Sequence, residues 1–327
     1  MSVGLPSPSL QNRPMAGERD PGYMSDSESP FHQAAMLGNA LMVLDTLIWS
    51  PSIIESRDSL DRTPLYAAAS RGQDMIVRLL LLRGAEKNAR CFWRKYTPLQ
   101  IAASAGHVGT VRVLLAAGAD HTVLGSSLKQ SLLHLAAGFG ETGASGFGGP
   151  NGTEQERLEI IKLLDNKLNV RAQDVRGWTV LDQAAWVGWQ EIVKYLVGLE
   201  DFTRTKDNLG RDAMFRAADG YRPSRDMIFF MIRSGFDVRT RNNLGQTPLH
   251  ETMEKDLTED RDRLENTLIL VEFGADPMAV DEFGQTALDK LLRGDKDYRL
   301  QFMLRSCKRT FEDAETVQGF RGESKLP

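Results

Sequence analysis

The apolar residues of this chain fall into short blocks that recur with a nearly constant period. Residues 63–85 read TPLYAAASRGQDMIVRLLLLRGA, in which a polar turn separates an alanine-rich run from a leucine-rich run. Residues 97–119, TPLQIAASAGHVGTVRVLLAAGA, restate that order 34 residues further on. Apolar residues at helical spacing on both sides of a turn predict two short helices per block. A period of this length indicates stacked repeats, because one helix pair cannot bury its own apolar face.

The threonine that opens each block marks the register of the repeats, and we call it and its equivalents the start residues. They are Ser29, Thr63, Thr97, Ser131, Thr179, Asp212, Thr247 and Thr286. This spacing gives eight repeats between residue 29 and about residue 308. A Ser, Thr or Asp side chain at this position is expected to cap the first helix, and a following proline fits the first helical turn.

The recurring elements T-P-L-H-x-A, G-H, L-L and G-A-D resemble the ankyrin repeat over more than four-fifths of the chain. The resemblance implies an all-α ankyrin-repeat solenoid, built of helix-turn-helix repeats and short β-hairpin fingers. In such an array the alanines let neighbouring first helices approach closely, and the leucines fill the space between repeats. The glycine after the second helix ends it in a left-handed conformation.

The two ends of the chain differ from the array between them. Residues 1–28 are rich in Pro, Ser, Gly and Arg, and residues 309–327 are polar, so we predict disordered segments at both ends of the array at 29–308. Three longer intervals place extra residues between the two helices of repeats four, six and seven. The longest is a glycine-rich insertion at 138–154, and deleting residues 141–151 is expected to leave the array folded.

The insertion opens with residues 138–143, GFGETG, which match a dinucleotide-binding pattern. That pattern has to follow a strand and open a helix, so that the helix N-terminus meets the pyrophosphate. Here Gly138 ends a predicted first helix, which is the opposite polarity. The match is therefore interpreted as a coincidence within a glycine-rich loop.

The histidines are explained by the repeat and do not indicate a catalytic site. His32, His134 and His250 lie three residues after a start residue, and His107 occupies the Gly-His position. The resemblance implies that such histidines hydrogen-bond the backbone of adjacent repeats. A zinc-protease helix would need a second histidine where Glu254 stands, and no G-x-S-x-G elbow or Gly-Lys P-loop is present. We therefore expect no enzyme activity, no cofactor and no metal site.

The fingers carry the candidate binding residues. Arginines lie eight residues before the start residue in three successive repeats, and an earlier finger combines basic and aromatic residues. The candidate partner-binding residues are Arg90, Phe92, Trp93, Arg94, Arg171, Arg176, Arg204, Lys206, Arg239 and Arg241. One interpretation is that these side chains are merely solvated, as on any exposed finger. The other is a surface for an acidic or phosphorylated protein segment, which Arg can hold in bidentate fashion.

Three tryptophans of the fifth repeat, Trp178, Trp186 and Trp189, leave a second question open. If they are exposed, they are a plausible anchor for a partner. If they are not, they are expected to pack against the glycine-rich insertion of the preceding repeat.

Composition and charge narrow the partner. The net charge of −4 and the lack of a basic arm argue against direct nucleic-acid binding, and no apolar run is long enough to span a membrane. The two cysteines are far apart in the sequence and fit a reducing compartment, so we expect the protein in the cytoplasm, the nucleus or both. We also expect it to be a monomer.

A chain composed almost entirely of such repeats is typical of non-catalytic protein-protein interaction modules. The loose motif and long insertions look like fungal ankyrin-repeat regulators, some of which are transcription co-regulators. We therefore expect a regulatory adaptor, most plausibly a co-regulator that binds a transcription factor or another protein through its fingers and first helices. The alternative is a cytosolic scaffold or a ubiquitin-ligase substrate adaptor.

Overall fold

The computed structural model describes residues 29–92, 95–125, 128–138, 152–199, 202, 205–220, 225–253 and 260–294, and for 260–265 and 291–294 only the backbone is considered. All regular elements in these ranges are helical. They are α1 (Pro30–Leu37), α2 (Ala40–Trp49), the 3-10 helix η1 (Pro51–Glu55), α3 (Pro64–Ser70), α4 (Asp74–Leu82), α5 (Pro98–Ala105), α6 (Val108–Ala116), α7 (Leu132–Ala137), α8 (Glu154–Leu164), α9 (Val180–Val187), α10 (Gln190–Leu199), α11 (Ala213–Ala218), α12 (Arg225–Arg233), α13 (Pro248–Glu251), α14 (Asp260–Glu272) and α15 (Ala287–Gly294).

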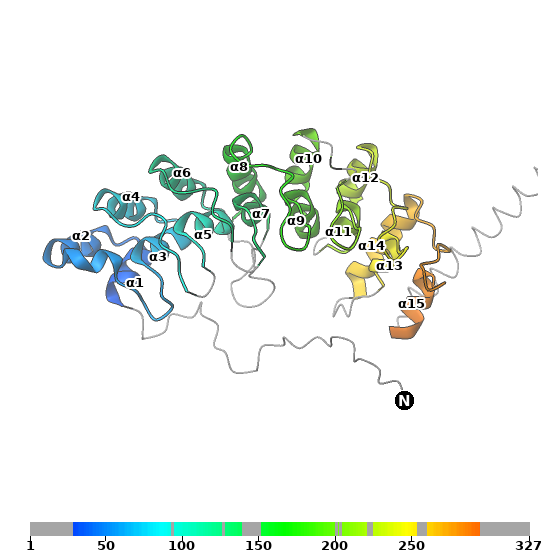
Figure 1. Ribbon diagram of the computed structural model, residues 1–327, viewed down its shortest axis with the longest axis horizontal. Helices are drawn as coiled ribbons and strands as arrows, with labels where there is room; N and C mark the ends of the chain where they lie inside the picture. Colours follow the sequence, from blue (N-terminus) through cyan, green and yellow to red (C-terminus); the bar gives the residue numbers. More distant parts are fainter. Residues whose placement is uncertain are drawn as a thin grey trace, which may run out of the picture.

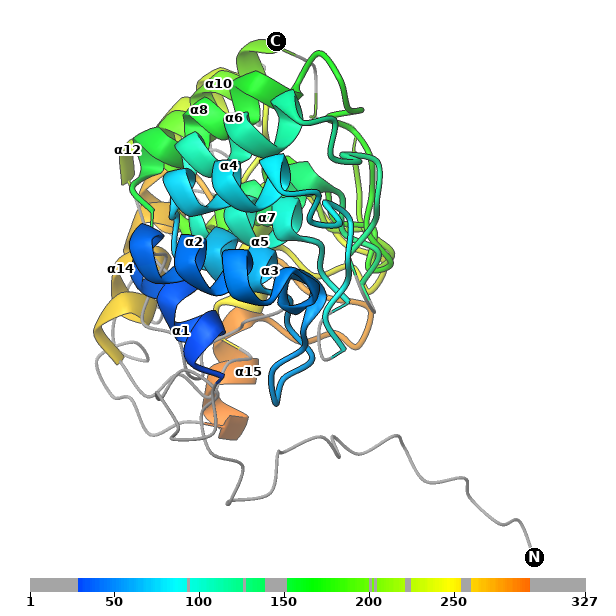
Figure 2. The same cartoon turned by 90° about the vertical axis from the view of Figure 1, so that its left-hand side faces the viewer.

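The α-helices pair in chain order, so that α1 and α2 form the first repeat and α13 and α14 the seventh, while α15 opens the eighth. Each first helix packs against the first helices of the neighbouring repeats, and the second helices α2, α4, α6, α8, α10 and α12 form a second layer on the outside. The result is the predicted curved, all-α solenoid (Figure 1). Viewed from its end, the fingers lie along one edge of the array (Figure 2). We call this the finger edge, and the opposite edge, where the two helices of each repeat are joined, the turn edge.

The start residues begin the first helices as the sequence predicts. The side chains of Thr63, Thr97 and Thr179 each accept a hydrogen bond from the backbone N–H three residues on, and Asp212 accepts one from Met214. The Ser29 side chain makes no such bond although α1 begins directly after it, and the hydroxyls of Ser131 and Thr247 instead contact the imidazole three residues on. The capped starts satisfy backbone donors that have no partner within the helix.

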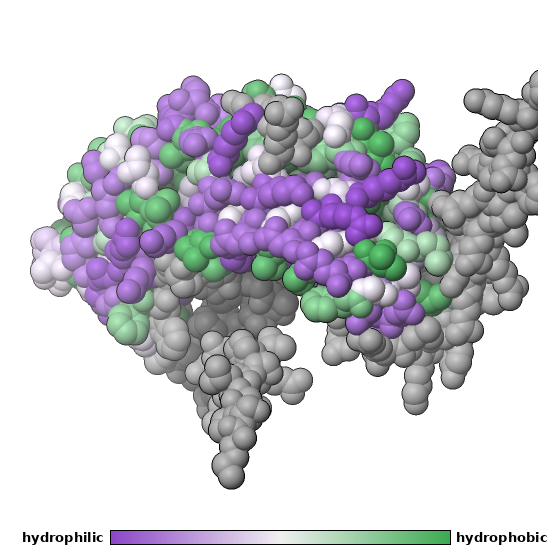
Figure 3. Space-filling model, turned by 45° about the vertical axis from the view of Figure 1, so that its right-hand side comes forward, coloured by the Kyte–Doolittle hydropathy of each residue, from purple (hydrophilic) through white to green (hydrophobic). Residues whose placement is uncertain are grey.

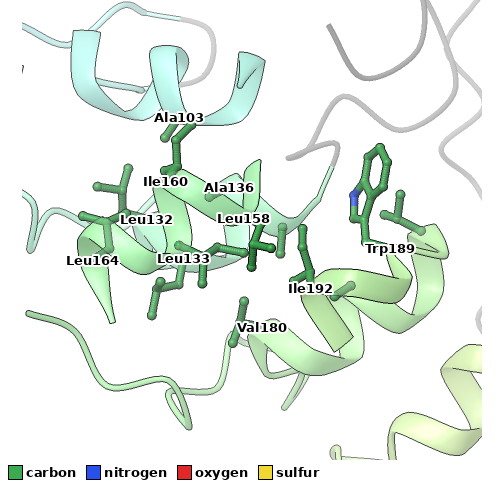
Figure 4. Close-up of a cluster of buried hydrophobic side chains, with 14 of the residues drawn as sticks. Ala103, Leu132, Leu133, Ala136, Leu158, Ile160, Leu164, Val180, Trp189 and Ile192 are labelled. Atoms are coloured by element: carbon green, nitrogen blue, oxygen red, sulfur yellow. The ribbon is translucent and has the colours of Figure 1, made fainter. Parts of the chain in front are cut away.

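The apolar core runs without interruption through the array. Alanine lies five residues after the start residue in six repeats, and Ala68, Ala102, Ala136, Ala184 and Ala217 are completely buried. The small side chain lets adjacent first helices pack closely, and the leucines and isoleucines of the second helices fill the remaining space. Figure 4 shows this at repeats four and five, where Leu133, Leu158 and Ile192 meet between layers.

The fingers differ from the prediction of short β-hairpins, because no strand forms in the described part of the chain. Each finger is instead a tight loop, and a backbone hydrogen bond joins the two ends of the loop. In five fingers this bond spans four residues, as from the Asp174 N–H to the Trp178 carbonyl (2.9 Å). In fingers three and four it spans five, from Cys91 to Tyr96 and from Gly125 to Gln130. The loops are too short for strand pairing, so turn chemistry determines their shape.

One finger position requires a left-handed backbone. It lies two residues before the start residue and is glycine in the fingers of repeats five to eight, as at Gly177 (φ 81°) and Gly210 (φ 77°). In repeats two to four it is occupied by Asp61, Lys95 and Lys129, with φ between 49° and 57°. A side chain in this region costs roughly 1–2 kcal/mol relative to the usual conformations, so the earlier fingers hold backbone strain that the later ones avoid.

At the turn edge, polar side chains of repeats two, four and seven connect each of these repeats to the one before it. Gln73 Nε2 donates to the Met36 carbonyl (2.9 Å), and Asn266 Nδ2 donates to the Ala218 carbonyl (2.7 Å). In the fourth repeat, the Arg157 guanidinium donates hydrogen bonds to three carbonyls of repeats three and four. Each acceptor ends a first helix, so these bonds satisfy carbonyl groups that the helix leaves unpaired.

The sequence predicted insertions at this same edge. The segments between α7 and α8, between α11 and α12 and between α13 and α14 are indeed the long connections within repeats. Most of their residues lie outside the described ranges, as do the predicted disordered ends.

Candidate functional site

The finger loops are built on a carboxylate or amide located five residues before the start residue. Asp174, Asp207, Asn242 and Asp281 each accept hydrogen bonds from the backbone N–H groups two and four residues on; for Asp207 these distances are both 2.9 Å. Such side-chain bonds to the local backbone stabilise a turn without a paired strand. The side chains that project from these fingers are therefore held on a fixed frame.

Neighbouring fingers are also bonded to each other through their backbones. The Asn208 N–H donates to the Arg176 carbonyl (3.1 Å), Asn243 to Leu209 (2.9 Å) and Glu282 to Leu244 (3.0 Å). These bonds link the fingers of repeats five to eight in series. The candidate side chains of different repeats thus belong to one continuous surface.

The cations six residues before the start residue reach forward onto the next finger. Lys206 Nζ donates to the Arg241 carbonyl (2.9 Å), and Arg241 Nη1 donates to the Val280 carbonyl (2.6 Å). Gln173, the equivalent residue of repeat five, bonds the Lys206 carbonyl in the same way (2.9 Å). These acceptors are neutral, so the bonds orient Lys206 and Arg241 without neutralising them.

The arginines eight residues before the start residue have separate contacts. Arg171 is exposed and its guanidinium lies 5.8 Å from the centre of the Phe202 ring. Arg239 is exposed and its Nε donates to the Gly274 carbonyl (2.8 Å). Arg204, the third member of the predicted row, lies outside the described residues. The two described members are both exposed on the finger edge.

The basic and aromatic finger of repeat three is only partly described. Phe92 is 71% exposed, and Arg90 is exposed while its carbonyl accepts a hydrogen bond from Arg57 Nη1 (2.7 Å). Trp93 and Arg94 lie outside the described residues. Glu86 and Asp120 are exposed on neighbouring fingers, so this end of the edge has mixed charge.

Arg176 pairs with a carboxylate of its own finger. Its guanidinium donates to Asp174 Oδ2 (2.7 Å) within its own finger. The guanidinium groups of Arg176 and Arg216 each lie 4.0 Å from the centre of the Trp178 ring. Arg176 therefore contributes more to finger structure than to an open binding surface.

This arrangement answers the question about the tryptophans. Trp178 and Trp189 are buried, Trp186 is half-buried, and Trp186 packs against Trp178 with ring centres 6.3 Å apart. The expectation of exposed tryptophan anchors is therefore wrong. Trp178 is covered by arginines from its own finger and from the next first helix, and Trp189 lies 5.8 Å from the guanidinium of buried Arg157.

The histidines three residues after the start residue connect repeats, as the resemblance implied. His134 Nε2 is 2.8 Å from the Trp178 carbonyl and its Nδ1 lies 2.7 Å from Ser131 Oγ. His32 and His250 make equivalent contacts with the Arg62 and Gln285 carbonyls. Burial is the main cause that lowers the pKa of each of these imidazoles. They are neutral structural links between adjacent repeats.

Repeats five and six replace this histidine link by buried charges, which sequence reasoning did not find. Asp182 occupies the histidine position, and burial raises the pKa of its carboxyl to about 6. Arg216 of α11 lies beside it and donates to Asp207 Oδ2 in the adjacent finger. The aspartate could have been noticed, because it stands where the repeat has histidine, but its arginine partner comes from a different repeat.

The exposed chemistry of the array is thus concentrated on the finger edge. The first helices α7, α9 and α11 are buried nearly throughout, so they offer few side chains to a partner. Among the described residues, no group of three His, Cys, Asp or Glu side chains could hold a metal ion, and no helix is long and apolar enough to cross a membrane. What the finger edge can do chemically is bind, through oriented cations and a rigid backbone frame.

Comparison with known proteins agrees with this architecture. Residues 31–125 match the family model for ankyrin repeats in three copies. The crystal structure of the human ASB11 ankyrin repeat domain covers 76% of this chain and 99% of its own, with a TM-score of 0.58 and 22% identity. Human BCL-6 corepressor-like protein 1 is 29% identical over 120 residues, which is 36% of this chain but only 6% of that protein. Residues 31–125 therefore match ankyrin repeats, and the chain shares the all-α solenoid fold of an ankyrin repeat domain.

Proposed function

We propose that this protein is a non-catalytic regulatory adaptor that binds a protein partner through its finger edge, and that it acts as a transcription co-regulator. The observation that carries the proposal is the set of exposed cations Arg171, Lys206, Arg239 and Arg241 on consecutive, backbone-linked fingers. Ordered side chains lose less conformational entropy on binding, which favours a specific partner. The similarity of one segment to a protein named as a corepressor supports the regulatory role.

The proposal narrows the binding surface relative to the sequence-based expectation. First helices and fingers were both expected to contribute, but the first helices are mostly buried. Ordered and exposed cations favour an acidic or phosphorylated segment, because arginine binds carboxylate and phosphate through charge-assisted hydrogen bonds. Nucleic acid is a less suitable partner, since the whole chain carries a net charge of −4.

The test is quantitative affinity purification and mass spectrometry from the native cell. The test variant carries Arg171→Glu, Lys206→Glu and Arg241→Glu, which reverses the finger charge. The matched control carries Arg71→Glu, Arg78→Glu and Arg83→Glu, three exposed arginines in and beside α4, away from the fingers. We expect the test variant alone to lose its partner proteins; unchanged recovery would reject the finger edge as the binding surface.

The co-regulator role has its own test in the same cells. Fluorescence imaging of the tagged chain should detect it in the nucleus. Strict exclusion from the nucleus would contradict co-regulation while leaving the adaptor role intact.

A further inference from the structure

The fourth and fifth fingers enclose a hollow that is separate from the exposed cations described above. It has a volume of about 400 Å³ and is lined by Leu124, Lys129, Ser131, His134, Ala172, Gln173, Asp174 and Val175. The fourth finger is one of the two that close over five residues instead of four. Val175 N–H nevertheless bonds the Leu128 carbonyl (2.9 Å), so the hollow lies between fingers that are joined at their tips.

Beyond the hollow, the finger tips present a row of exposed apolar side chains. Val175 is 51% exposed, and Leu209 and Leu244, which lie three residues before their start residues, are 54% and 43% exposed. The inter-finger backbone bonds at Asn208 and Asn243 place these tips on directly adjacent fingers. In Figure 3 hydrophilic side chains dominate the visible face of the array, with separate hydrophobic patches among them.

Near their tips these fingers carry exposed charge of one sign, whereas Asp120 and Asp237 are exposed where the fourth and seventh fingers leave the second helices. In residues 124–125, 128–130, 171–176, 205–211 and 239–246 the exposed charged side chains are Lys129, Arg171, Lys206, Arg239 and Arg241, and the two acids, Asp174 and Asp207, are buried. The eighth finger is different, because Glu282 is exposed at its tip. The basic, apolar-tipped surface therefore extends from the fourth finger to the seventh.

The spacing of the tips selects the conformation of a ligand that follows them. Packed helices lie about 8–10 Å apart, and the fingers repeat with the helices that carry them. In a polyproline II segment three residues advance about 9.3 Å and return to the same side, so every third side chain meets the next finger. A β-strand advances a similar distance in three residues, but the side chain of the third residue on then points away from the fingers. A helical ligand needs a groove, whereas these tips are single side chains on a row of loops.

We propose that this surface binds an extended acidic segment of a partner protein, with an apolar side chain at every third position. The surface consists of the hollow, with Leu124 and Val175, and of the finger tips Leu209 and Leu244. One apolar side chain enters the hollow, and the next two pack on the following finger tips. Carboxylates between them reach Lys206 and Arg241, whose donors are held by neutral carbonyls. This inference rests on the proposed adaptor function and specifies the chemistry of its partner.

The experiment is fluorescence anisotropy with a labelled peptide of four Leu-Glu-Pro units, added to the full chain. This peptide has the required period, charge and polyproline preference, and its length of about 37 Å covers the hollow and the tips. One control peptide carries four Leu-Lys-Pro units, which reverses the charge. The other carries six Leu-Glu pairs, which changes the period to two and has six glutamates instead of four, so that weaker binding cannot come from a loss of negative charge. We expect saturable binding of the first peptide and at least about tenfold weaker binding of both controls, a difference of roughly 1.4 kcal/mol.

Protein variants assign the binding to the tips. Leu209→Glu with Leu244→Glu should weaken binding of the Leu-Glu-Pro peptide by about tenfold or more, as expected for loss of central apolar contacts. Met75→Glu with Leu82→Glu is the matched control, because both residues are exposed on α4. Equal thermal midpoints for the two variants would show that folding is unaffected.

Three results would overturn the inference: no saturable binding, equal binding of the period-two peptide, or equal effects of the two variant pairs. These failures are distinguishable from failure of the adaptor function. If the charge-reversed fingers lose native partners but the Leu-Glu-Pro peptide does not bind, the adaptor function stands and only the proposed partner chemistry is wrong.

Discussion

The two edges of the solenoid connect neighbouring repeats with the same kind of bond in opposite surroundings. At the turn edge, Arg157 is 1% exposed and donates to carbonyls of repeats three and four, and Asn266 is 4% exposed. At the finger edge, Lys206 and Arg241 also donate to carbonyls of the next repeat, but they are exposed. An unpaired buried acceptor costs far more than an exposed one, which water can satisfy. Stability is therefore concentrated at the turn edge, and the finger edge is available for binding.

Arg157→Met breaks the turn edge and should have the largest effect. The guanidinium donates to the Ala136 carbonyl (2.8 Å), the Gly138 carbonyl (3.1 Å) and the Ser104 carbonyl (2.8 Å). Its loss leaves three buried acceptors unpaired at about 1–3 kcal/mol each. Burial of the charged guanidinium is itself unfavourable and lowers the pKa of Arg157 to about 10. Removing this charge therefore offsets part of the lost stability.

We expect a net loss of about 3 kcal/mol in the free energy of unfolding, measured by urea denaturation. Arg157→Lys is the control, since it keeps the charge and some donors and should lose less. A loss below about 1 kcal/mol for Arg157→Met would show that the turn edge does not carry the stability assigned to it.

Acidification should weaken the histidine links between these edges. His32, His134 and His250 have a lowered pKa in the folded chain, so the unfolded chain binds their protons more readily. Their contribution is complete above the ordinary histidine pKa of about 6.5 and is lost as the pH falls below it. The thermal midpoint should therefore decrease between pH 7 and pH 5.

Repeat three supplies the matching substitution. Gln100 occupies the histidine position there, accepts from the Thr97 N–H (2.9 Å) and donates to the Val123 carbonyl (2.8 Å). Changing His32, His134 and His250 to Gln should keep these links and reduce the pH dependence. An equally steep decrease in that variant would assign the acid sensitivity to other groups.

Substitutions in the strained fingers should have a smaller effect on folding stability, and they should increase it. Lys95→Gly and Lys129→Gly place glycine at left-handed positions with φ of 49° and 51°. Relief of strain outweighs the added freedom of the unfolded chain, so each change should stabilise by about 0.5–1 kcal/mol. Gly210→Ala, at φ 77°, is the reverse control and should destabilise. Both are read from thermal midpoints, and stabilisation by Gly210→Ala would contradict the conformational argument.

Much of this architecture could be predicted from the sequence, because each repeat restates the same local signals. The start residues, the buried alanines and the structural histidines all follow from one register. The insertions hide that register, so Arg157 could not be recognised as the counterpart of Gln73 and His107 at the turn edge.

The candidate site was less predictable, for a physical reason. Exposure depends on contacts between repeats, which the sequence of one repeat does not contain. Trp178 is covered by Arg216 of the next first helix, so the expected aromatic anchor is buried. The apolar tips Leu209 and Leu244 were not identified, although they stand at the same position before their start residues as Arg176.

We conclude that the turn edge stabilises the array and that the finger edge is available for binding. This conclusion is tested most directly by the thermal midpoint of one finger variant. In Arg171→Ala, Lys206→Ala, Arg241→Ala, three exposed side chains are truncated on linked fingers. Exposed donors contribute little, so the account predicts a decrease of no more than about 4 °C, roughly 1 kcal/mol for an array of this size. A decrease as large as that caused by Arg157→Met would contradict it, because the finger edge would then be needed to hold the repeats together.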